Sequence, residues 1–330
     1  MHAIGSFSGL PSSDPDSLVD VDVPRPTLKP NDILVAVEAV SVNPVDVKVR
    51  AGLRPSDTPK IVGWDASGTV VEIGSAVEHF AIGDRDYYAG DVTRQGSNAE
   101  LQAVDERIVG HAPASLSFAE AAAMPLTTIV AFETLFDRLR LTQDSSGTLL
   151  ALAAAGGTGS ILAQVAKKLT GLQVIGTASS DASQEFARRM GADHVVDHHG
   201  ELAASVLDIV AGGVDYVFSS HTRGQVKTFA QLMRPLGQIV VIDEVGDESI
   251  DPLKSKSISW HWESMFARPT TGYDIGYQGE LLDTAAALFD DGTLVSTLTT
   301  TLDGFTATNL REAHRLVETG KTIGKVVVTR

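Results

Sequence analysis

Residues 147–160, GTLLALAAAGGTGS, join a short apolar run to a cluster of glycines. The run at 148–153 is apolar enough for a buried parallel strand, and an amphipathic helix should begin near Ser160. Glycine permits a tight turn and lets backbone amides approach a pyrophosphate without a Cβ between them, while the helix N-terminus attracts phosphate. The stretch therefore predicts a dinucleotide-binding loop, with a flexible strand-to-helix loop as the alternative. The residues predicted to bind the cofactor are Ala155, Gly156, Gly157, Thr158, Gly159 and Ser160.

The elements around this loop must hold it at the edge of a sheet. Apolar segments predict strands at 173–178 and 194–196, with a helix at 182–190 between them. This alternation of strand and helix is typical of an α/β fold with a doubly wound parallel sheet, the Rossmann architecture. Further segments expected in it are strands at 215–218, 238–243 and 257–260, a helix at 224–233 and a turn at 235–237.

The rest of the chain follows a different pattern, and a length of 330 residues favours two domains. Short strands separated by Gly, Pro, Asn and Asp predict a mostly antiparallel β domain. A capping box of Ser117 and Glu120 precedes a helix expected to run through 127–138 and to join the domains. We expect one domain at 1–123 with 265–330 and the other at 124–264. The first should contain strands at 33–42, 68–73, 99–104 and 325–329 and helices at 279–289 and 308–318.

Composition excludes several kinds of chemistry. The 26 basic and 42 acidic residues give a net charge of −16, so neither nucleic acid nor an anionic membrane is an expected partner. The absence of cysteine excludes disulfides, thiolate ligands and a cysteine nucleophile. No Ser-His-Asp arrangement, carboxylate pair or Walker sequence supports hydrolysis or phosphoryl transfer. Because the chain has no signal-peptide h-region and no apolar run of about 18 residues, we expect a soluble, cytoplasmic protein.

Several longer segments carry a family resemblance. In chain order they are NPVDVKVRAG, IVGWDASGTVVEIG, GDRDYYAG, AAGGTGS, RRMGADHVVDH and GKTIGKVVV. They resemble the medium-chain dehydrogenases/reductases, and within these the zinc-independent quinone oxidoreductases, over nearly the whole chain. The stretch GDVTRQGSNAELQAVDERIVG is similar to the branch called zinc-type alcohol dehydrogenase-like. The resemblance implies a GroES-like catalytic domain beside the Rossmann domain, and a homodimer.

The resemblance also bears on the metal. Where the zinc alcohol dehydrogenases have a cysteine ligand this chain has Asn43, and where they have a histidine ligand it has Trp64. Neither side chain is a zinc ligand of the usual kind, so we predict an enzyme without zinc. The group His194, Asp197, His198 and His199 lies at a strand end, where side chains diverge to opposite faces, and a metal is not expected there.

The resemblance places the nicotinamide between the domains, near Ser219, Asp243, Gly324 and Lys325. The chain departs from the family where a TAW or TAY triplet is usual and this chain has Val130, Ala131 and Phe132, with Thr127 one turn earlier as the substitute. Asp86 also stands where an apolar residue is usual.

The residues after the second strand favour NADPH. A carboxylate there would bind the ribose 2′-hydroxyl and repel a 2′-phosphate, and this chain has Ser179 and Ser180 instead. NADH stays possible because Asp181 follows directly, and because Ser183 replaces a lysine that is common in quinone oxidoreductases. His198 stands where relatives often have a tyrosine that contacts the 2′-phosphate.

Candidates for substrate contact are Asn43 and Tyr88 as catalytic residues and Trp64 and Trp262 as pocket residues. The alternatives are a turn residue for Asn43, strand packing for Tyr88, and sheet-edge packing or a subunit interface for Trp262. We predict an NADPH-dependent oxidoreductase that transfers hydride to quinones or conjugated carbonyls. The alternatives are an enoyl or alkenal reductase and a cofactor-binding protein with little turnover.

Overall fold

The computed structural model describes residues 1–330 and divides into two compact units. Unit 1 comprises Met1–Ile129 and Met265–Arg330, and unit 2 comprises Val130–Ser264. The chain passes between them within α3 (Pro125–Phe132), so the boundary lies after Ile129 and not after residue 123 as predicted. None of the helices combines the length and the hydropathy that a membrane span requires.

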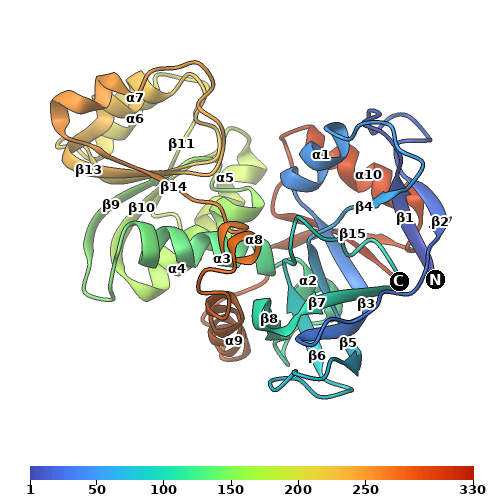
Figure 1. Cartoon of the computed structure of the whole chain (residues 1–330). Helices are drawn as coiled ribbons and strands as arrows, with labels where there is room; N and C mark the ends of the chain where they lie inside the picture. The colour runs from blue at the N-terminus through green and yellow to red at the C-terminus, as the bar shows by residue number, and fades with distance from the viewer. The chain divides into compact units, whose positions relative to one another are not determined.

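Unit 2 is built on a six-stranded parallel sheet with the order β11-β10-β9-β12-β13-β14. The chain adds strands first on one side of β9 and then on the other, which confirms the doubly wound sheet. In Figure 1, α6 and α7 cover one face of this sheet and α4 covers the other. The strands are β9 (Ser146–Ala151), β10 (Gly171–Thr177), β11 (His194–Val196), β12 (Val214–Ser219), β13 (Met233–Val241) and β14 (Ser259–Trp262). The helices are η2 (Glu133–Arg138, a π-helix), α4 (Gly157–Leu169), α5 (Asp181–Arg189), α6 (Leu202–Ile209), α7 (Val226–Leu232) and η3 (Asp251–Lys256).

Three details of unit 2 differ from the sequence predictions. The expected turn at 235–237 lies inside β13 as a bulge, where Leu236 has a φ of 66° and the pairing skips from Met233 to Gln238. Helix α6 was not predicted from the sequence. It buries only Leu202 and Val206, and two buried positions are too few to give a helical apolar pattern. The expected helix at 127–138 is α3 followed by the π-helical η2.

Unit 1 is mainly antiparallel, as predicted, and only β15 and β16 pair in parallel in its larger sheet. That seven-stranded sheet has the order β15-β16-β3-β5-β6-β8, and β7 also pairs with β3. Its strands are β3 (Asp32–Val42), β5 (Asp65–Ile73), β6 (Arg85–Tyr88), β7 (Leu101–Asp105), β8 (Val109–His111), β15 (Leu298–Asp303) and β16 (Lys325–Thr329). A small sheet joins β1 (His2–Ser6), β2 (Val19–Asp22) and β4 (Lys60–Ile61).

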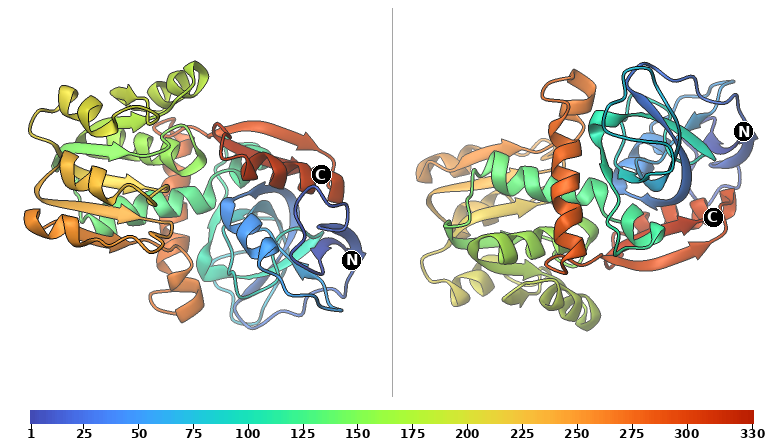
Figure 2. Two further views of the ribbon diagram at one scale, coloured as in Figure 1. Left: turned by 90° about the horizontal axis from the view of Figure 1, so that it is seen from above. Right: turned by 90° about the horizontal axis from the view of Figure 1, so that it is seen from below.

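Unit 1 also contains helices, which are α1 (Pro44–Ala51), η1 (Glu106–Ile108), α2 (Phe118–Ala122), α8 (Ala267–Thr271), α9 (Tyr277–Asp290) and α10 (Ala307–Glu318). Of these, α2, α9 and α10 pack against strands of the seven-stranded sheet. Figure 2 shows α10 beside the C-terminal strands, and Leu310 and Ala313 of α10 join Val326 and Val328 of β16 in one apolar core. Because β16 also pairs with β3, the C-terminal segment is fixed to the strand that leads directly into α1.

Candidate functional site

The glycine loop of unit 2 connects β9 to α4 and is tied to the end of β10. The amide of Ala153 donates to Thr177 Oγ1 at 2.9 Å, and the amide of Ala154 donates to the Thr177 carbonyl at 3.0 Å. Ala153 itself has a φ of 53°, in the left-handed region that is unusual for a residue with a Cβ. Thr177, which sequence reasoning missed, therefore fixes the path of the loop.

The N-terminus of α4 is free of side-chain caps. Gly156 is the N-cap residue and offers no side-chain acceptor, so the first amides of the helix remain open to an external acceptor. These amides and the positive end of the helix dipole suit a pyrophosphate. A Cβ on Gly156 would meet only the Ala153 carbonyl oxygen, at 3.3 Å, whereas one on Gly159 would lie 2.3 Å from that oxygen. Gly159 is thus required for packing, and Gly156 keeps the approach to the amides open.

Ser160 takes a different part from the one predicted. Its side chain is buried, and its hydroxyl donates to the Gly157 carbonyl at 3.0 Å. The hydroxyl is therefore used within the helix, and a cofactor would meet only the backbone there.

Hydroxyl and imidazole groups gather where β10 and β11 end. The amide of Ala178 donates to the Val196 carbonyl at 3.1 Å, so the segments that follow the two strands start side by side. Ser179 and Ser180 are exposed, and Ser180 caps α5 by accepting from the Ser183 amide at 3.2 Å. This edge therefore offers hydroxyl donors where a carboxylate would select NADH.

His198 lies at the same edge and is exposed, with its ring centroid 4.3 Å from that of His199. Partial burial lowers the pKa of His198, and the neighbouring His199 and His221 lower it further, whereas Asp197 acts in the opposite direction. The adjacent imidazole of His199 thus disfavours protonation of His198.

Ser219 and Asp243 follow the neighbouring strands β12 and β13 and are joined by a residue that sequence reasoning missed. Thr222 Oγ1 donates to Asp243 Oδ1 and lies 2.9 Å from Ser219 Oγ, whose hydroxyl can donate to it. Asp243 Oδ2 accepts from the Thr222 backbone amide at 2.7 Å. These bonds fix the loop after β12. No sequence signal distinguishes Thr222 from an ordinary polar loop residue.

In unit 1, four buried polar residues form what we call the Asn43 cluster: Asn43, Asp46, Asp65 and Lys325. Asn43 Nδ2 donates to Asp65 Oδ2 at 2.8 Å, and Lys325 Nζ lies 2.9 Å from the same oxygen. Lys325 also donates to Asn43 Oδ1. The side-chain amide of Asn43 therefore has a hydrogen-bond partner at both its nitrogen and its oxygen, which fixes its orientation.

Of the other three carboxylate oxygens of the cluster, two accept from backbone amides and one has no hydrogen-bond partner. Asp65 Oδ1 accepts from the Leu126 amide at 2.8 Å. Asp46, in the first turn of α1, accepts from the Asn43 backbone amide through Oδ2 at 2.5 Å, while its Oδ1 is buried without a hydrogen-bond partner. Sequence reasoning missed both carboxylates, although a charged residue at the first position of β5, directly after Trp64, was a usable signal for Asp65.

These residues do not fit a zinc ion. Asn43 already binds Asp65 and Lys325, and a buried ammonium at Asp65 would repel a second cation. No group of three or more His, Cys, Asp or Glu side chains in the structure could hold a metal ion. Zinc sites usually have three or four protein ligands, and the Asn43 cluster does not supply such a set.

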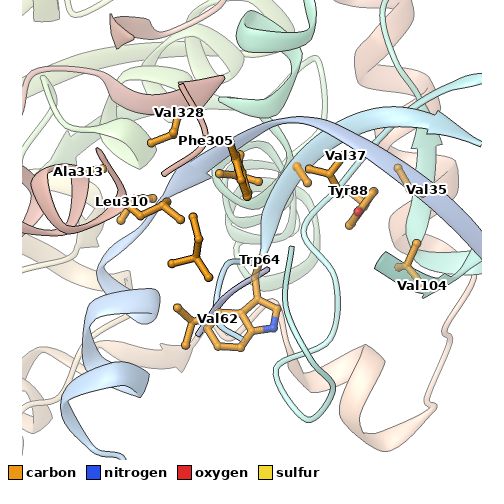
Figure 3. Close-up of a cluster of buried hydrophobic side chains, with 14 of the residues drawn as sticks. Val35, Val37, Val62, Trp64, Tyr88, Val104, Phe305, Leu310, Ala313 and Val328 are labelled. Atoms are coloured by element: carbon orange, nitrogen blue, oxygen red, sulfur yellow. The ribbon is translucent and has the colours of Figure 1, made fainter. Parts of the chain in front are cut away.

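Trp64 and Tyr88 belong to the apolar core of unit 1, as Figure 3 shows. Both are fully buried: Trp64 Nε1 donates to the Asp91 carbonyl at 3.1 Å, and the Tyr88 hydroxyl donates to Gln102 Oε1 at 2.7 Å. Burial raises the pKa of Tyr88 well above its ordinary value. The structure gives these two residues a packing role in place of the predicted pocket-lining and catalytic roles.

The remaining predicted residues take varied positions. Gly324 has a φ of 62°, and a Cβ there would lie 2.3 Å from the Thr297 carbonyl oxygen, so it is a turn residue. The side chain of Lys325 belongs to the Asn43 cluster and is 3% exposed. Thr127 is buried and donates to the Met124 carbonyl at 3.3 Å. Trp262 is 58% exposed on β14, the last strand of its sheet.

Comparisons with known proteins agree with this arrangement. Residues 29–133 match the alcohol dehydrogenase GroES-like domain, and residues 190–328 match the zinc-binding dehydrogenase family. The zinc-type alcohol dehydrogenase-like protein of Staphylococcus aureus (strain COL) is 40% identical over 311 residues, which cover 92% of each chain.

Two further relatives extend the comparison. The 2-methylene-furan-3-one reductase of Solanum lycopersicum is 30% identical over 322 residues, covering 94% of this chain and 74% of that protein. A crystal structure from Rhizobium etli CFN 42, assigned to the zinc-dependent alcohol dehydrogenases, is 44% identical with a TM-score of 0.96, covering 100% of this chain and 98% of that one. The chain therefore belongs to the medium-chain dehydrogenase/reductase superfamily of oxidoreductases, in its quinone oxidoreductase-like, zinc-type alcohol dehydrogenase-like branch.

Proposed function

We propose that this protein is an NADPH-dependent reductase of quinones or conjugated carbonyls that works without zinc. The observation that carries the proposal is the Asn43 cluster, in which an ammonium and an amide occupy the polar centre of unit 1. The uncapped N-terminus of α4 supports a dinucleotide in unit 2.

The residues divide the work of such a reaction. The backbone amides at the start of α4 would bind the pyrophosphate, and the bound nicotinamide would supply hydride. Asn43 has a second amide N–H beyond the one given to Asp65, and this donor is the candidate for a substrate oxygen. A quinone gains a hydride and a proton to become a hydroquinone, and the negative charge formed on the way is spread over the conjugated system. One or two hydrogen-bond donors then suffice, whereas a simple ketone needs stronger help such as a metal.

The preference for NADPH over NADH rests on the edge formed by β10 and β11. Ser179 and His198 offer donors to a 2′-phosphate, and neither Ser179 nor Ser180 is a carboxylate that would repel it. The Ser180 hydroxyl already donates to Ser183 Oγ at 2.9 Å. Asp181, at the first position of α5, is the residue that would favour NADH.

Two alternatives concern the activity itself. An enoyl or alkenal reductase uses the same hydride transfer to an activated double bond, and the Solanum relative is named as a reductase of a methylene-furanone. A cofactor-binding protein with little turnover is the non-catalytic alternative, since nothing in the Asn43 cluster requires a substrate for its stability.

We also propose a homodimer joined at β14. This strand ends the sheet order, and the exposed Trp262 lies beside Trp260 with ring centroids 6.0 Å apart. An edge strand that carries a large exposed aromatic ring suits pairing with a second copy. Trp262→Glu should shift the particle mass measured by light scattering from two chains to one, and a monomeric wild-type protein would reject the proposal.

The test of function is steady-state NADPH oxidation with ortho- and para-quinones, enals and enones, beside simple ketones and alcohols. We expect turnover with the conjugated acceptors and little with the simple ones. No NADPH oxidation with any conjugated acceptor, together with tight NADPH binding, would favour the non-catalytic alternative. A preference for simple alcohols would contradict the mechanism.

A further inference from the structure

The Asn43 cluster contains two carboxylates and one ammonium, and the two carboxylates have unequal surroundings. Asp65 is paired with Lys325 at 2.9 Å and also accepts from Asn43 Nδ2 and the Leu126 amide. Asp46 accepts one hydrogen bond through Oδ2, and its buried Oδ1 accepts none. If both were ionised, the cluster would hold one uncompensated charge on the poorly solvated Asp46.

The hydrogen bonds and charges around the two carboxylates decide which of them carries a proton. A buried ionised carboxylate with an orphan oxygen is costly, whereas its protonated form loses most of that penalty. Asp65, in contrast, is surrounded by the Lys325 ammonium and two N–H donors. One proton on Asp46 leaves a single matched ion pair between Asp65 and Lys325.

Resting on the function proposed above, we propose that Asp46 is a positioning residue of the reductase. Its protonated form keeps the Lys325 ammonium bound to Asn43 and Asp65, and so holds the side-chain amide of Asn43 in position to donate to a substrate oxygen. Asp46 itself does not touch the substrate. Its ionisation would add a second anion to the cluster, which would compete for the ammonium and oppose the negative charge that develops on a reduced carbonyl.

The electrostatics around Asp46 give the pH range. Burial raises its pKa to about 7, and the charge of Asp65 on β5 raises it as well. The backbone amides of Asn43 and Trp64 and the charge of Lys325 on β16 act in the opposite direction. The proton should therefore leave within the range in which enzymes are usually assayed.

The first measurement does not depend on turnover. Infrared spectra of wild-type protein and of Asp46→Asn at pH 6 should differ by the carbonyl band of one protonated carboxylic acid. In wild-type protein that difference should disappear with a midpoint near pH 7. A pH 6 spectrum without the band would show that Asp46 is ionised and would overturn the proposal.

The second measurement is the pH profile of kcat with a conjugated acceptor. For wild-type protein we expect kcat to fall by about tenfold per pH unit above the pKa of Asp46, with NADPH affinity unchanged within about twofold. Asp46→Asn should keep kcat level across the same range. A variant that retained the wild-type decline would show that another group causes it.

Matched variants separate this role from simple helix capping. Asp46→Ser copies the arrangement of α5, where Ser183 at the same helical position accepts from the Ser180 amide at 3.0 Å, and it serves if Asp46→Asn folds poorly. Glu120→Gln changes the equivalent capping carboxylate of α2, which has no ammonium partner, and should leave the profile unchanged. If wild-type protein reduced no acceptor at all, the proposed function and the kinetic role would both fail, while the infrared result would still decide the proton on Asp46.

Discussion

Lys325 Nζ and Asp65 Oδ2 lie 2.9 Å apart, and both side chains are almost completely buried in unit 1. Lys325 comes from the first residue of β16 and Asp65 from the first residue of β5. The pair therefore connects the start of a C-terminal strand to the start of a strand in the first quarter of the chain.

Lys325→Met should destabilise unit 1 by about 3 to 5 kcal/mol, because it leaves the Asp65 carboxylate buried without its counter-ion. Chemical denaturation followed by circular dichroism measures the loss. Adding Asp65→Asn should recover part of it, since the stranded charge is then removed. Arg315→Met, which breaks the exposed pair with Glu312, is the control and should change little. Equal losses of unfolding free energy in Lys325→Met and Arg315→Met would contradict the prediction that burial makes the Lys325 pair the more important one.

Gly156→Val should abolish cofactor binding while the protein still folds, because its Cβ meets only one atom at 3.3 Å but the side chain would cover the amides of α4. NADPH at about one hundred times its Kd should stabilise wild-type protein by about 2.7 kcal/mol in thermal unfolding, and this variant by nothing. Gly159→Val, whose Cβ would lie 2.3 Å from a carbonyl oxygen, should instead fail to fold. A cofactor shift in Gly156→Val would place the pyrophosphate elsewhere.

Ser180→Asp should move the preference from NADPH toward NADH by about tenfold or more, which corresponds to about 1.4 kcal/mol. Aspartate is a good N-cap residue, so α5 should keep its start and the variant should remain stable. Fluorescence titration with the two cofactors gives the ratio of Kd values. An unchanged ratio would show that the 2′-phosphate lies away from this edge.

Asp86→Asn should stabilise the protein, and more so as the pH rises. Asp86 is buried, and neither of its carboxylate oxygens has a hydrogen-bond partner. Burial raises the pKa of Asp86 well above 3.8, and the charge of Asp84 adds a smaller effect in the same direction. The folded state thus holds a proton that the unfolded chain releases above about pH 3.9, so wild-type stability falls by about 1.4 kcal/mol per pH unit until the folded group ionises. Urea denaturation of both proteins between pH 5 and 8 tests this, and a gap that stayed constant would contradict it.

Treatment with a chelator should leave turnover and folding unchanged, because the positions at issue hold Asn43, Trp64 and a Lys325 ammonium. Elemental analysis of the purified protein should find zinc well below one ion per chain. Stoichiometric zinc whose removal abolished activity would reject this prediction.

Most of the fold could be predicted from the sequence because its signals are local. The glycine loop and the strands β9, β10 and β11 all lie between residues 146 and 196, and β11 and β16 have the bounds that the sequence predicted. The Pro235 turn was wrong because the turn residues are accommodated as a bulge once β12 and β14 pair on both sides. That outcome depends on tertiary pairing and not on turn propensity.

The Asn43 cluster could be predicted only in part. Asn43 was identified as a candidate, but its partners Asp65 and Lys325 lie 22 and 282 residues away, and no local pattern announces such contacts. Trp64 and Tyr88 looked like site residues because aromatic side chains suit both pockets and cores. Their complete burial is decided by packing between β5, β6 and β7, which a single sequence does not display.

Unit 1 is made of two stretches of chain separated by the whole of unit 2, and this has a consequence for synthesis on the ribosome. Unit 2 is continuous and can fold as soon as it emerges, whereas Asp46 and Asp65 wait for Lys325, which is made only after the whole of unit 2. Until then the nascent chain carries two carboxylates in a half-formed core with no cation beside them. A chain that stops or is cut between unit 2 and Lys325 would therefore keep a first segment of unit 1 in which Asp65 has no counter-ion.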